Sequence, residues 1–430
     1  MLLQTDEQTT ADLRLFSDQQ QNGICDLYNK TFSRGGELLL ERMFRAPLCD
    51  REAINDRVAI ISTFSKVNIR FPFDSWVLDK TEKYFSYAND VHDAKKPELS
   101  EKETSESVSA VIELLHVLRA FINNNHISSI TGMAKQNAEI AELLNHDSLA
   151  PVFREQPKPK LSYAAATAYD DLFRLREKDK LARVLQFIYL LDVYISVADV
   201  ARQNGFTFPV ALPKGSGIIA LEGVYHPGLK HPVPNNITMD SNKSLIFLTG
   251  ANMAGKSTFL RSLSIALYTA HIGFPVAAKR MDFSVMDGIY TTINLPDNLG
   301  IGASHFYAEV LRVKKIAAEL GAGKSLFVVF DELFRGTNVK DAHEGTVVVT
   351  KGFAKMKTSR FIISSHIVEA ADQLKQQTNT RFYYLPTTMK DSLPVYNYTL
   401  KEGVTDDRHG MIIIKNEGIL EILKNGKKNG

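Results

Sequence analysis

The sequence predicts two domains of different fold class: an all-α domain over residues 1–205, and an α/β domain over residues 206–430 in which helices flank a mostly parallel sheet. Two observations support this. Before Gly205, apolar residues recur at helical spacing and strand-like runs are scarce. After it, short apolar runs alternate with helical segments. The breaker-rich run FTFPVALPKGSG marks the boundary between the two domains.

Three segments of the first domain have the apolar periodicity of helices: residues 110–122, 127–144 and 163–203. A charged loop is expected over residues 94–106, with Ser105 as the N-cap of the next helix. Residues 148–162 contain three prolines, which exclude a continuous helix there. These features predict long helices joined by turns.

Four runs of the second domain are typical of buried strands: residues 244–249, 325–330, 360–364 and 381–385. A helical run over residues 257–270 follows the first of them. Strands that alternate with helices in this way predict a mainly parallel, doubly wound sheet.

Length and composition are those of a folded, soluble protein, with 430 residues of which 44% are hydrophobic and 23% charged. The formal charge of +2 indicates no general preference for nucleic acid or membrane, but it is the sum of −6 over residues 1–200 and +8 over residues 201–430. Two cysteines, Cys25 and Cys49, are too few for a disulfide framework. Since neither a signal-like N-terminus nor a run of 18 apolar residues occurs, a cytoplasmic protein with no membrane partner is expected.

A phosphate-binding motif lies between the first predicted strand and its helix. Residues 250–257 read GANMAGKS, a complete G-x-x-x-x-G-K-[ST] pattern, whose glycines let successive N–H groups face a phosphate. Lys256 is expected to reach the β and γ phosphates, and Ser257 to supply an oxygen to Mg²⁺. The expected nucleotide-binding residues are Gly250, Ala251, Asn252, Met253, Ala254, Gly255, Lys256, Ser257 and Thr258. The alternative is an ordinary glycine-rich turn.

Three polar residues follow the next two predicted strands. Asp331 and Glu332 come directly after residues 325–330; we expect Asp331 to hold magnesium and Glu332 to orient the attacking water. The alternative for this acidic pair is the N-cap of a following helix. His366 follows residues 360–364, where an imidazole can donate a hydrogen bond to a γ-phosphate, although a lone histidine is usually an ordinary surface or core residue.

Four segments together resemble one known family. They are GANMAGKSTFLRSLSIALYTAHIGFPVAA, GASHFYAEV, DELFRGTN and SSHI, and their order and spacing resemble the ATPase domain of MutS-type proteins, the ABC-like ATPases of DNA mismatch repair. The resemblance covers residues 223–415. Residues 18–58 look like the start of that family's helical lever domain, and residues 191–209 like its return into the ATPase.

The resemblance implies an ABC-type P-loop ATPase preceded by an all-α lever or core domain, with ATP and Mg²⁺ as ligands. In this family the site is composite, and a signature serine of the partner subunit contacts the γ-phosphate; here it matches Ser304 in GASHF, beside Gly302. This implies a homodimer through the ATPase domain. Asn252 matches the residue that helps to position water and phosphate, and Asp341 falls where a dimer-contacting loop begins.

The chain also departs from the family pattern. We find no match to three parts of the family: the domain that reads mismatches, the DNA clamp, and the C-terminal helix-turn-helix of many members. The mismatch-reading domain carries a Phe-x-Glu motif. A tripeptide of that form begins at Phe153, but it lies in the proline-rich stretch and is interpreted as coincidence. The segment HPVPNNI, residues 231–237, resembles the loop that cradles adenine but has no aromatic residue for stacking, so His231 or Pro232 would have to substitute.

The expected function is slow MgATP hydrolysis coupled to DNA binding, in mismatch repair or related processing of DNA structures, with a repair protein as a further partner. The acidic first half argues against a broad phosphate-binding surface. A basic patch could still come from Lys158, Lys160, Arg174, Arg176, Lys178, Lys180 and Arg183. The alternative is a nucleotide-gated switch that binds a protein rather than DNA; a generic P-loop motor or kinase is a third hypothesis.

Overall fold

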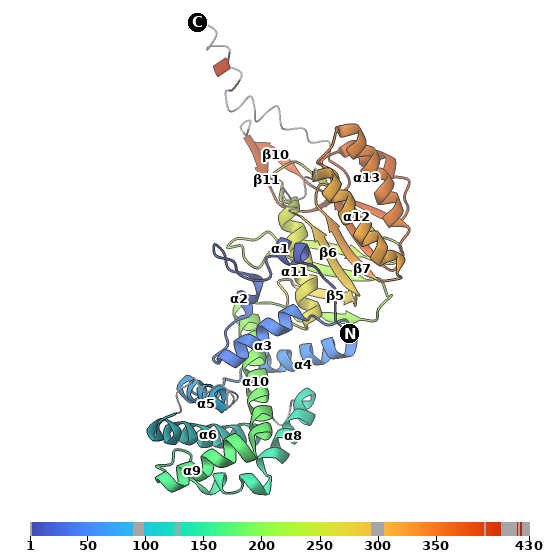
Figure 1. Ribbon diagram of the computed structural model, residues 1–430. Helices are drawn as coiled ribbons and strands as arrows, with labels where there is room; N and C mark the ends of the chain where they lie inside the picture. Colours follow the sequence, from blue (N-terminus) through green and yellow to red (C-terminus); the bar gives the residue numbers. More distant parts are fainter. Residues whose placement is uncertain are drawn as a thin grey trace. The chain divides into compact units, whose positions relative to one another are not determined.

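The computed structural model describes residues 2–88, 99–124, 127, 130–293, 305–390, 393–405, 419, 422 and 423. The chain divides into two compact units (Figure 1). The sheet unit consists of Met1–Ile24, Ala46–Asn55 and Gly205–Gly430, and the helical unit of Cys25–Arg45 and Asp56–Asn204.

The sequence predicts one division, after residue 205. In the structure the two units divide between residues 204 and 205 and at three earlier points, after residues 24, 45 and 55. Two early segments join the sheet unit through backbone hydrogen bonds. Gln4 forms a parallel bridge with Gly288, and the Leu48 N–H donates to the His271 carbonyl at 2.8 Å. Both segments are short and lack a clear period, so the sequence pattern gives no sign that they leave the helical domain.

The described residues of the helical unit form helices and turns. The helices are α3 (Arg34–Arg45), α5 (Ser75–Ala88), α6 (Glu101–Ile122), α8 (Ala134–Leu144), α9 (Tyr163–Asp171) and α10 (Lys178–Asn204), with the short helices η1 (Thr131–Met133), η2 (Asp147–Leu149), η3 (Val152–Arg154) and η4 (Leu172–Arg176). Two more, α2 (Ile24–Tyr28) and α4 (Arg51–Val67), cross the division between the units.

The predicted start of α6 is wrong. The helix is capped by Ser100 and not by Ser105, so residues 101–106 are helical. The Ser100 hydroxyl accepts from the Glu103 N–H at 3.3 Å, and the Glu103 carboxylate accepts from the Ser100 N–H at 3.1 Å. This reciprocal S-x-x-E capping box satisfies two backbone donors, which explains why the helix begins there.

The long run predicted over residues 163–203 is not one continuous helix. A π-helical turn, η4, separates α9 from α10, and in it the Glu177 N–H donates to the Leu172 carbonyl at 2.8 Å. Beyond this turn α10 is the core helix of its unit. By length and composition α10 could cross a membrane, but 78% of its apolar window is buried within the protein, as in the core helix of a soluble protein.

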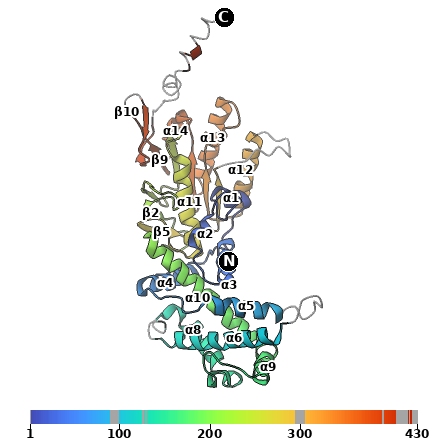
Figure 2. The ribbon, with the colours of Figure 1, turned by 90° about the vertical axis from the view of Figure 1, so that its left-hand side faces the viewer.

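The sheet unit, which Figure 2 draws from a second side, contains a main sheet of six strands in the order β12-β9-β4-β8-β7-β6, parallel except for β12. Its strands are β4 (Leu245–Gly250), β6 (Gly288–Thr292), β7 (Leu326–Phe330), β8 (Arg360–Ser364), β9 (Thr380–Leu385) and β12 (Lys401–Glu402). The four predicted strands are thus present, side by side. A smaller sheet, in the order β1-β5-β2-β3, comprises β1 (Val210–Leu212), β2 (Ile219–Val224), β3 (Asn235–Met239) and β5 (Arg280–Ser284), and β10 (Thr387–Lys390) pairs with β11 (Leu393–Tyr396).

Helices cover the main sheet. Besides the short α1 (Glu7–Asp12), the unit contains α11 (Lys256–Ile272), α12 (His305–Gly321), α13 (Val339–Ala354) and α14 (Val368–Leu374). Side chains of α12, α13 and α14 share one buried cluster with alternate residues of the central strands, such as Val328 and Phe330 of β7. Helix α11 contacts β4 and β6 of the main sheet and β2 of the smaller one, so it lies between the two sheets.

Candidate nucleotide site

The strand order places the predicted site residues together. Since β4, β8 and β7 are parallel neighbours, the loop after β4, the end of β8 and the acidic pair after β7 meet at one edge of the sheet. In the loop, Gly250 and Gly255 have φ values of 146° and 97°, in the region that favours glycine. A Cβ atom on Gly255 would lie 2.9 Å from the Tyr398 ring, so space excludes a side chain there as well.

Lys256, the first residue of α11, is buried beneath this loop. Its Nζ donates to the Gly250 carbonyl at 2.8 Å and to the Ala251 carbonyl at 3.2 Å, and lies 3.8 Å from Glu332 Oε1. Burial lowers the pKa of Lys256, an effect that the nearby Glu332 and Asp331 carboxylates oppose. The site therefore presents a poorly solvated positive charge, which suits a phosphate.

Asp331 is held by two serines. Ser257 of α11 donates a hydrogen bond to Asp331 Oδ2, and Ser364 at the end of β8 donates one to Oδ1. The hydroxyl of Ser257 and the carboxylate of Asp331 are thus close enough to bind one hard cation. Magnesium prefers oxygen ligands and often takes only one or two from the protein, with phosphate and water supplying the rest, so these two residues fit Mg²⁺. Among the described residues, no group of three His, Cys, Asp or Glu side chains could hold a metal by itself.

Glu332 has a left-handed backbone, with φ at 57°. Such a conformation is uncommon for a residue other than glycine and is often kept at functional sites. The Glu332 N–H donates to Ser364 Oγ at 3.0 Å, while Arg335 Nη1 lies 4.0 Å from the Glu332 carboxylate. The alternative reading of the acidic pair as a helix cap is wrong, because the next helix, α13, is capped by Asn338.

A pocket of about 500 Å³ joins these groups. Its walls include Ala251, Asn252, Met253, Gly255, Lys256, Ser257 and Thr258 from the predicted set, together with Asp331 and Glu332. Gly250 and Ala254 belong to the same loop but do not line the pocket. His366 is exposed two residues beyond β8 and does not line the pocket either. The role of His366 stays a prediction. Ser304 and Gly302 lie outside the described residues. Asp341 belongs to the first turn of α13, where Asn338 binds it.

Sequence reasoning missed four residues of the site: Ser364, Ile293, Arg335 and Tyr398. Tyr398 is an aromatic residue of the pocket lining whose backbone is hydrogen-bonded to Asn235, within segment 231–237. Its carbonyl accepts from Asn235 Nδ2 at 2.9 Å, across 163 positions of sequence, and the Leu400 N–H donates to Asn235 Oδ1 at 2.6 Å. Asn235 therefore fixes the chain that carries the tyrosine beside the phosphate-binding loop. No local pattern indicates this pairing.

Comparisons with known proteins agree with this geometry. Residues 246–429 match the family model described as MutS domain V. The chain is 30% identical over 265 residues to the DNA mismatch repair protein MutS of Persephonella marina. The matched stretch covers 60% of this chain and 30% of that protein. With the protein of the same name from Streptococcus thermophilus it shares 29% identity over 269 residues, or 60% of this chain and 31% of the relative. The chain thus spans about a third of the length of the curated relatives it matches.

Proposed function

Because this chain is a MutS-family protein that carries domain V over residues 246–429, we propose that its sheet unit is an ABC-type ATPase that binds ATP with Mg²⁺ and hydrolyses it. One observation carries the proposal: Lys256, at the start of α11, lines a single pocket together with the glycine-rich loop and with Asp331 and Glu332, which directly follow β7. A structural turn would need neither the buried lysine nor the two carboxylates.

The residues of the pocket divide the work of phosphoryl transfer. The loop N–H groups and Lys256 bind the β and γ phosphates and stabilise the charge that develops on them. Ser257 and Asp331 would hold Mg²⁺, which supplies positive charge to the phosphate oxygens. Glu332 orients and polarises the water for in-line attack, and Asn252 helps to position water and phosphate. Hydrolysis by such a switch is expected to be slow.

Tyr398 supplies an aromatic surface for the nucleotide base. It lines the same pocket as the phosphate-binding loop, and 45% of its surface is exposed. An exposed ring beside the phosphate-binding loop can stack on adenine. Such stacking discriminates little between bases, because every base has an aromatic face. Stacking on Tyr398 would thus replace the contact for which segment 231–237 offers no aromatic residue.

The proposed site is composite and needs a homodimer formed through the sheet unit. The support is the family resemblance, in which Ser304 of each subunit donates to the γ-phosphate bound by its partner, with His366 as a further donor in cis. A small donor that reaches the phosphate from another subunit acts in the way of an arginine finger.

We further propose that the helical unit is the lever of the family and couples ATP hydrolysis in the cytoplasm to DNA binding. The relatives are DNA mismatch repair proteins, which supports a role in mismatch repair or related processing of DNA. The helical unit limits the basic surface available for this task, because at least five of the seven basic residues of the possible patch are in ion pairs. The pairs are Lys158–Glu113, Arg174–Asp170, Arg176–Asp171, Lys180–Glu177 and Arg183–Glu139.

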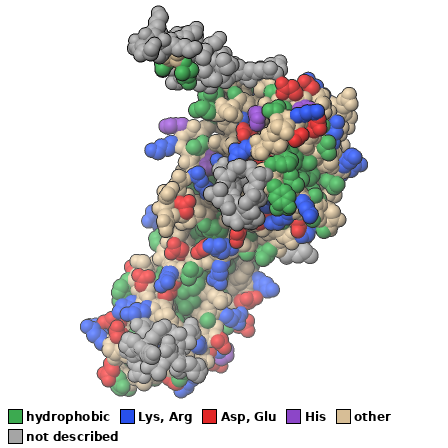
Figure 3. All heavy atoms as spheres, turned by 45° about the horizontal axis from the view of Figure 1, so that its top comes forward, with side chains coloured by type: hydrophobic (Ala, Val, Ile, Leu, Met, Phe, Trp, Pro, Cys, Tyr) green, Lys and Arg blue, Asp and Glu red, His purple; other side chains and the backbone are tan. Residues whose placement is uncertain are grey.

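This pairing favours a second candidate function, a nucleotide-gated switch whose helical unit binds a protein, such as a repair protein, in place of DNA. Figure 3 shows acidic and basic side chains interspersed over the displayed face of the helical unit. Those of the pairs that are exposed, such as Arg176–Asp171 and Arg183–Glu139, are weak and can exchange for phosphate, so they reduce the electrostatic attraction to DNA without removing it.

The ATPase rate decides between the two functions. It should be measured without DNA and with duplex, mismatched and branched DNA, each at two salt concentrations. Stimulation that weakens as salt rises supports DNA coupling, because phosphate contacts release counterions. If the protein hydrolyses ATP but no DNA stimulates or binds it, the protein-binding switch is the better function. Absence of ATP binding would reject both.

A further inference from the structure

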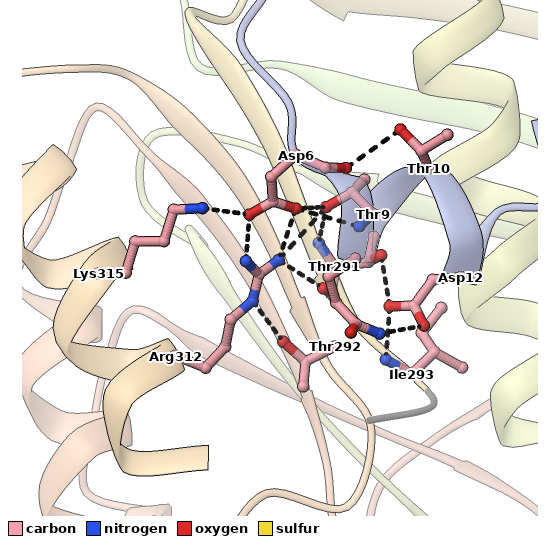
Figure 4. Close-up of polar contacts among 10 residues, drawn as sticks. Asp6, Thr9, Thr10, Asp12, Thr291, Thr292, Ile293, Arg312 and Lys315 are labelled. Atoms are coloured by element: carbon pink, nitrogen blue, oxygen red, sulfur yellow. Dashed lines mark hydrogen bonds and ion pairs between the residues drawn. The ribbon is translucent and has the colours of Figure 1, made fainter. Parts of the chain in front are cut away.

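The segment before the helical unit closes the edge of the main sheet. Strand β6 is the last strand in the sheet order, and Gln4 pairs with it. The Gln4 N–H donates to the Asp287 carbonyl at 2.8 Å, and the Ile289 N–H donates to the Gln4 carbonyl at 3.0 Å. Helix α1 follows at once and lies against β6 (Figure 4).

Asp6 joins α1 to α12. It is the N-cap of α1, with Oδ1 accepting from the Thr9 N–H at 3.1 Å. The same carboxylate binds Arg312 of α12 through both terminal nitrogens of the guanidinium, Nη2 at 3.1 Å, and Lys315 through Nζ at 2.7 Å. The Arg312 side chain is 8% exposed and that of Asp6 14%. Burial alone would raise the pKa of Asp6, but the hydrogen bonds from Arg312 and Lys315 hold it well below its usual range.

Arg312 also binds the end of β6. Its Nη2 donates to the Thr291 carbonyl at 2.8 Å and its Nε to Thr292 Oγ1 at 3.2 Å. A bidentate guanidinium fixes direction as well as distance, which a lysine cannot do. Arg312 lies seven residues after His305, the first residue of α12. A rigid helix spans about 10 Å over seven residues, so fixing Arg312 also fixes the position of the first turn of α12.

Asp12, at the other end of α1, binds Thr291 and Ile293, at the end of the described range 130–293. Its Oδ2 accepts from Thr291 Oγ1 and from the Ile293 N–H, both at 2.8 Å, and the residue is 3% exposed. Ile293 lines the nucleotide pocket. The Asp12 carbonyl accepts from Arg261 Nε of α11 at 3.1 Å. Helix α1 thus contacts the end of β6, the start of the phosphate-binding helix and α12 together.

We propose that Asp6, through Arg312, is a positioning residue that sets α12 for a contact with the nucleotide bound by a second copy of this chain. The inference rests on the proposed function, in which Ser304, the residue before α12 in the sequence, acts in trans. A residue outside the sequence motifs named above, in a segment that precedes the helical unit, would then control the partner's turnover and not its own nucleotide binding.

The test is subunit complementation with Asp6→Asn and Glu332→Gln. Asparagine still caps a helix, so α1 keeps its N-cap while Arg312 and Lys315 lose the charged partner. Asp6→Asn alone should bind ATP as the wild type does but turn over at least tenfold more slowly. Glu332→Gln alone should be inactive, yet it keeps an intact α12.

In an equal mixture, the mixed dimer combines the phosphate site of the Asp6→Asn subunit with the α12 of the Glu332→Gln subunit. One of its two sites is complete, so random pairing should restore about a quarter of the wild-type rate. If the mixture stays as slow as the two separate variants, Asp6 acts in cis and the proposal is wrong. A wild-type rate for Asp6→Asn alone also overturns it.

Asp240→Asn is the matched control. Asp240 likewise accepts from a backbone N–H, that of Lys243 at 2.8 Å, and from an arginine, Arg381, at 3.0 Å, but it lies outside the α1–α12 contact. Its rate should equal that of the wild type. If Asp6→Asn does not fold, Arg312→Lys, which keeps the charge and loses the bidentate geometry, takes its place in the same mixture under the same criteria. A wild-type protein without ATPase activity would instead reject the proposed function itself.

Discussion

Ser364, the last residue of β8, donates a hydrogen bond to Asp331, the first residue after β7. The same hydroxyl accepts from the Glu332 N–H at 3.0 Å. One serine therefore orients two residues of the proposed site: the side chain of Asp331, the proposed magnesium ligand, and the backbone of Glu332, the glutamate proposed to polarise water. Because both strands are buried and parallel, this hydroxyl is fixed by the sheet itself.

Ser364→Ala should weaken the use of magnesium. Loss of a hydrogen bond to a charged group costs about 1.5 kcal/mol or more, so the Mg²⁺ concentration for half-maximal ATPase activity should rise roughly tenfold. The measurement is a magnesium titration of the steady-state rate. Ser359→Ala is the control, since Ser359 accepts from the Leu326 N–H at 2.9 Å at the opposite end of β7. An unchanged titration for Ser364→Ala would mean that Asp331 needs no such support.

Lys256→Ala and Glu332→Gln should separate binding from turnover. Lys256 provides the buried positive charge, and its loss should weaken ATP binding by at least tenfold. Glu332→Gln should leave the Kd for ATP nearly unchanged and lower kcat by about 100-fold or more. Equilibrium binding and single-turnover rates check both. Equal loss of binding in the two variants contradicts the roles assigned here.

Tyr398→Ala should reduce the affinity for ATP. Stacking of a base on an aromatic ring is worth about 1–3 kcal/mol, which corresponds to a rise in Kd of at least roughly fivefold. Tyr398→Phe keeps the ring and should bind normally. Tyr396→Ala removes the neighbouring ring, whose centroid lies 6.3 Å from that of Tyr398, and should have little effect. Normal binding by Tyr398→Ala would show that the base lies elsewhere.

The fold should lose stability in mild acid through His271. Its Nδ1 lies 2.8 Å from the Leu267 carbonyl and its Nε2 accepts from the Met286 N–H at 3.1 Å, so the buried ring is bonded as the neutral form. Burial lowers the pKa of His271 from 6.5 to about 4. The unfolded chain binds the proton first, so the contribution is complete above pH 6.5 and is lost as the pH falls toward 4.

That contribution is on the order of 3 kcal/mol. Urea unfolding at a series of pH values should show it as a decline in the free energy of unfolding below pH 6.5. In His271→Gln the decline should be smaller, whereas the exposed His231→Gln should follow the wild type. Parallel curves for wild type and His271→Gln would contradict this role of the buried ring.

Local patterns were enough to predict the glycine-rich loop, the acidic pair and the four main strands, because each depends on residues adjacent in sequence. Ser364 and Tyr398 could not be found in this way. Ser364 gains its role from the neighbouring strand, and Tyr398 from Asn235, 163 positions away. The same holds for the first residues of the chain, which pack on β6. In the helical unit, the error at Ser105 was of another kind, since two serines could cap α6 and only Ser100 has Glu103 in the reciprocal position.

The contact between Asp6 and Arg312 also has a consequence for biosynthesis. The two residues are 306 positions apart. At translation rates of about 5–20 residues per second, Asp6 leaves the ribosome roughly 15–60 s before its partner does. For most of that interval β6 has not been made, so the first segment has no sheet edge to pair with, although the whole helical unit can already be complete. The pairing of the first segment with β6 and α12 should therefore come late in folding. This late step should determine chaperone dependence and the order of folding on the ribosome more than the folding of either unit alone.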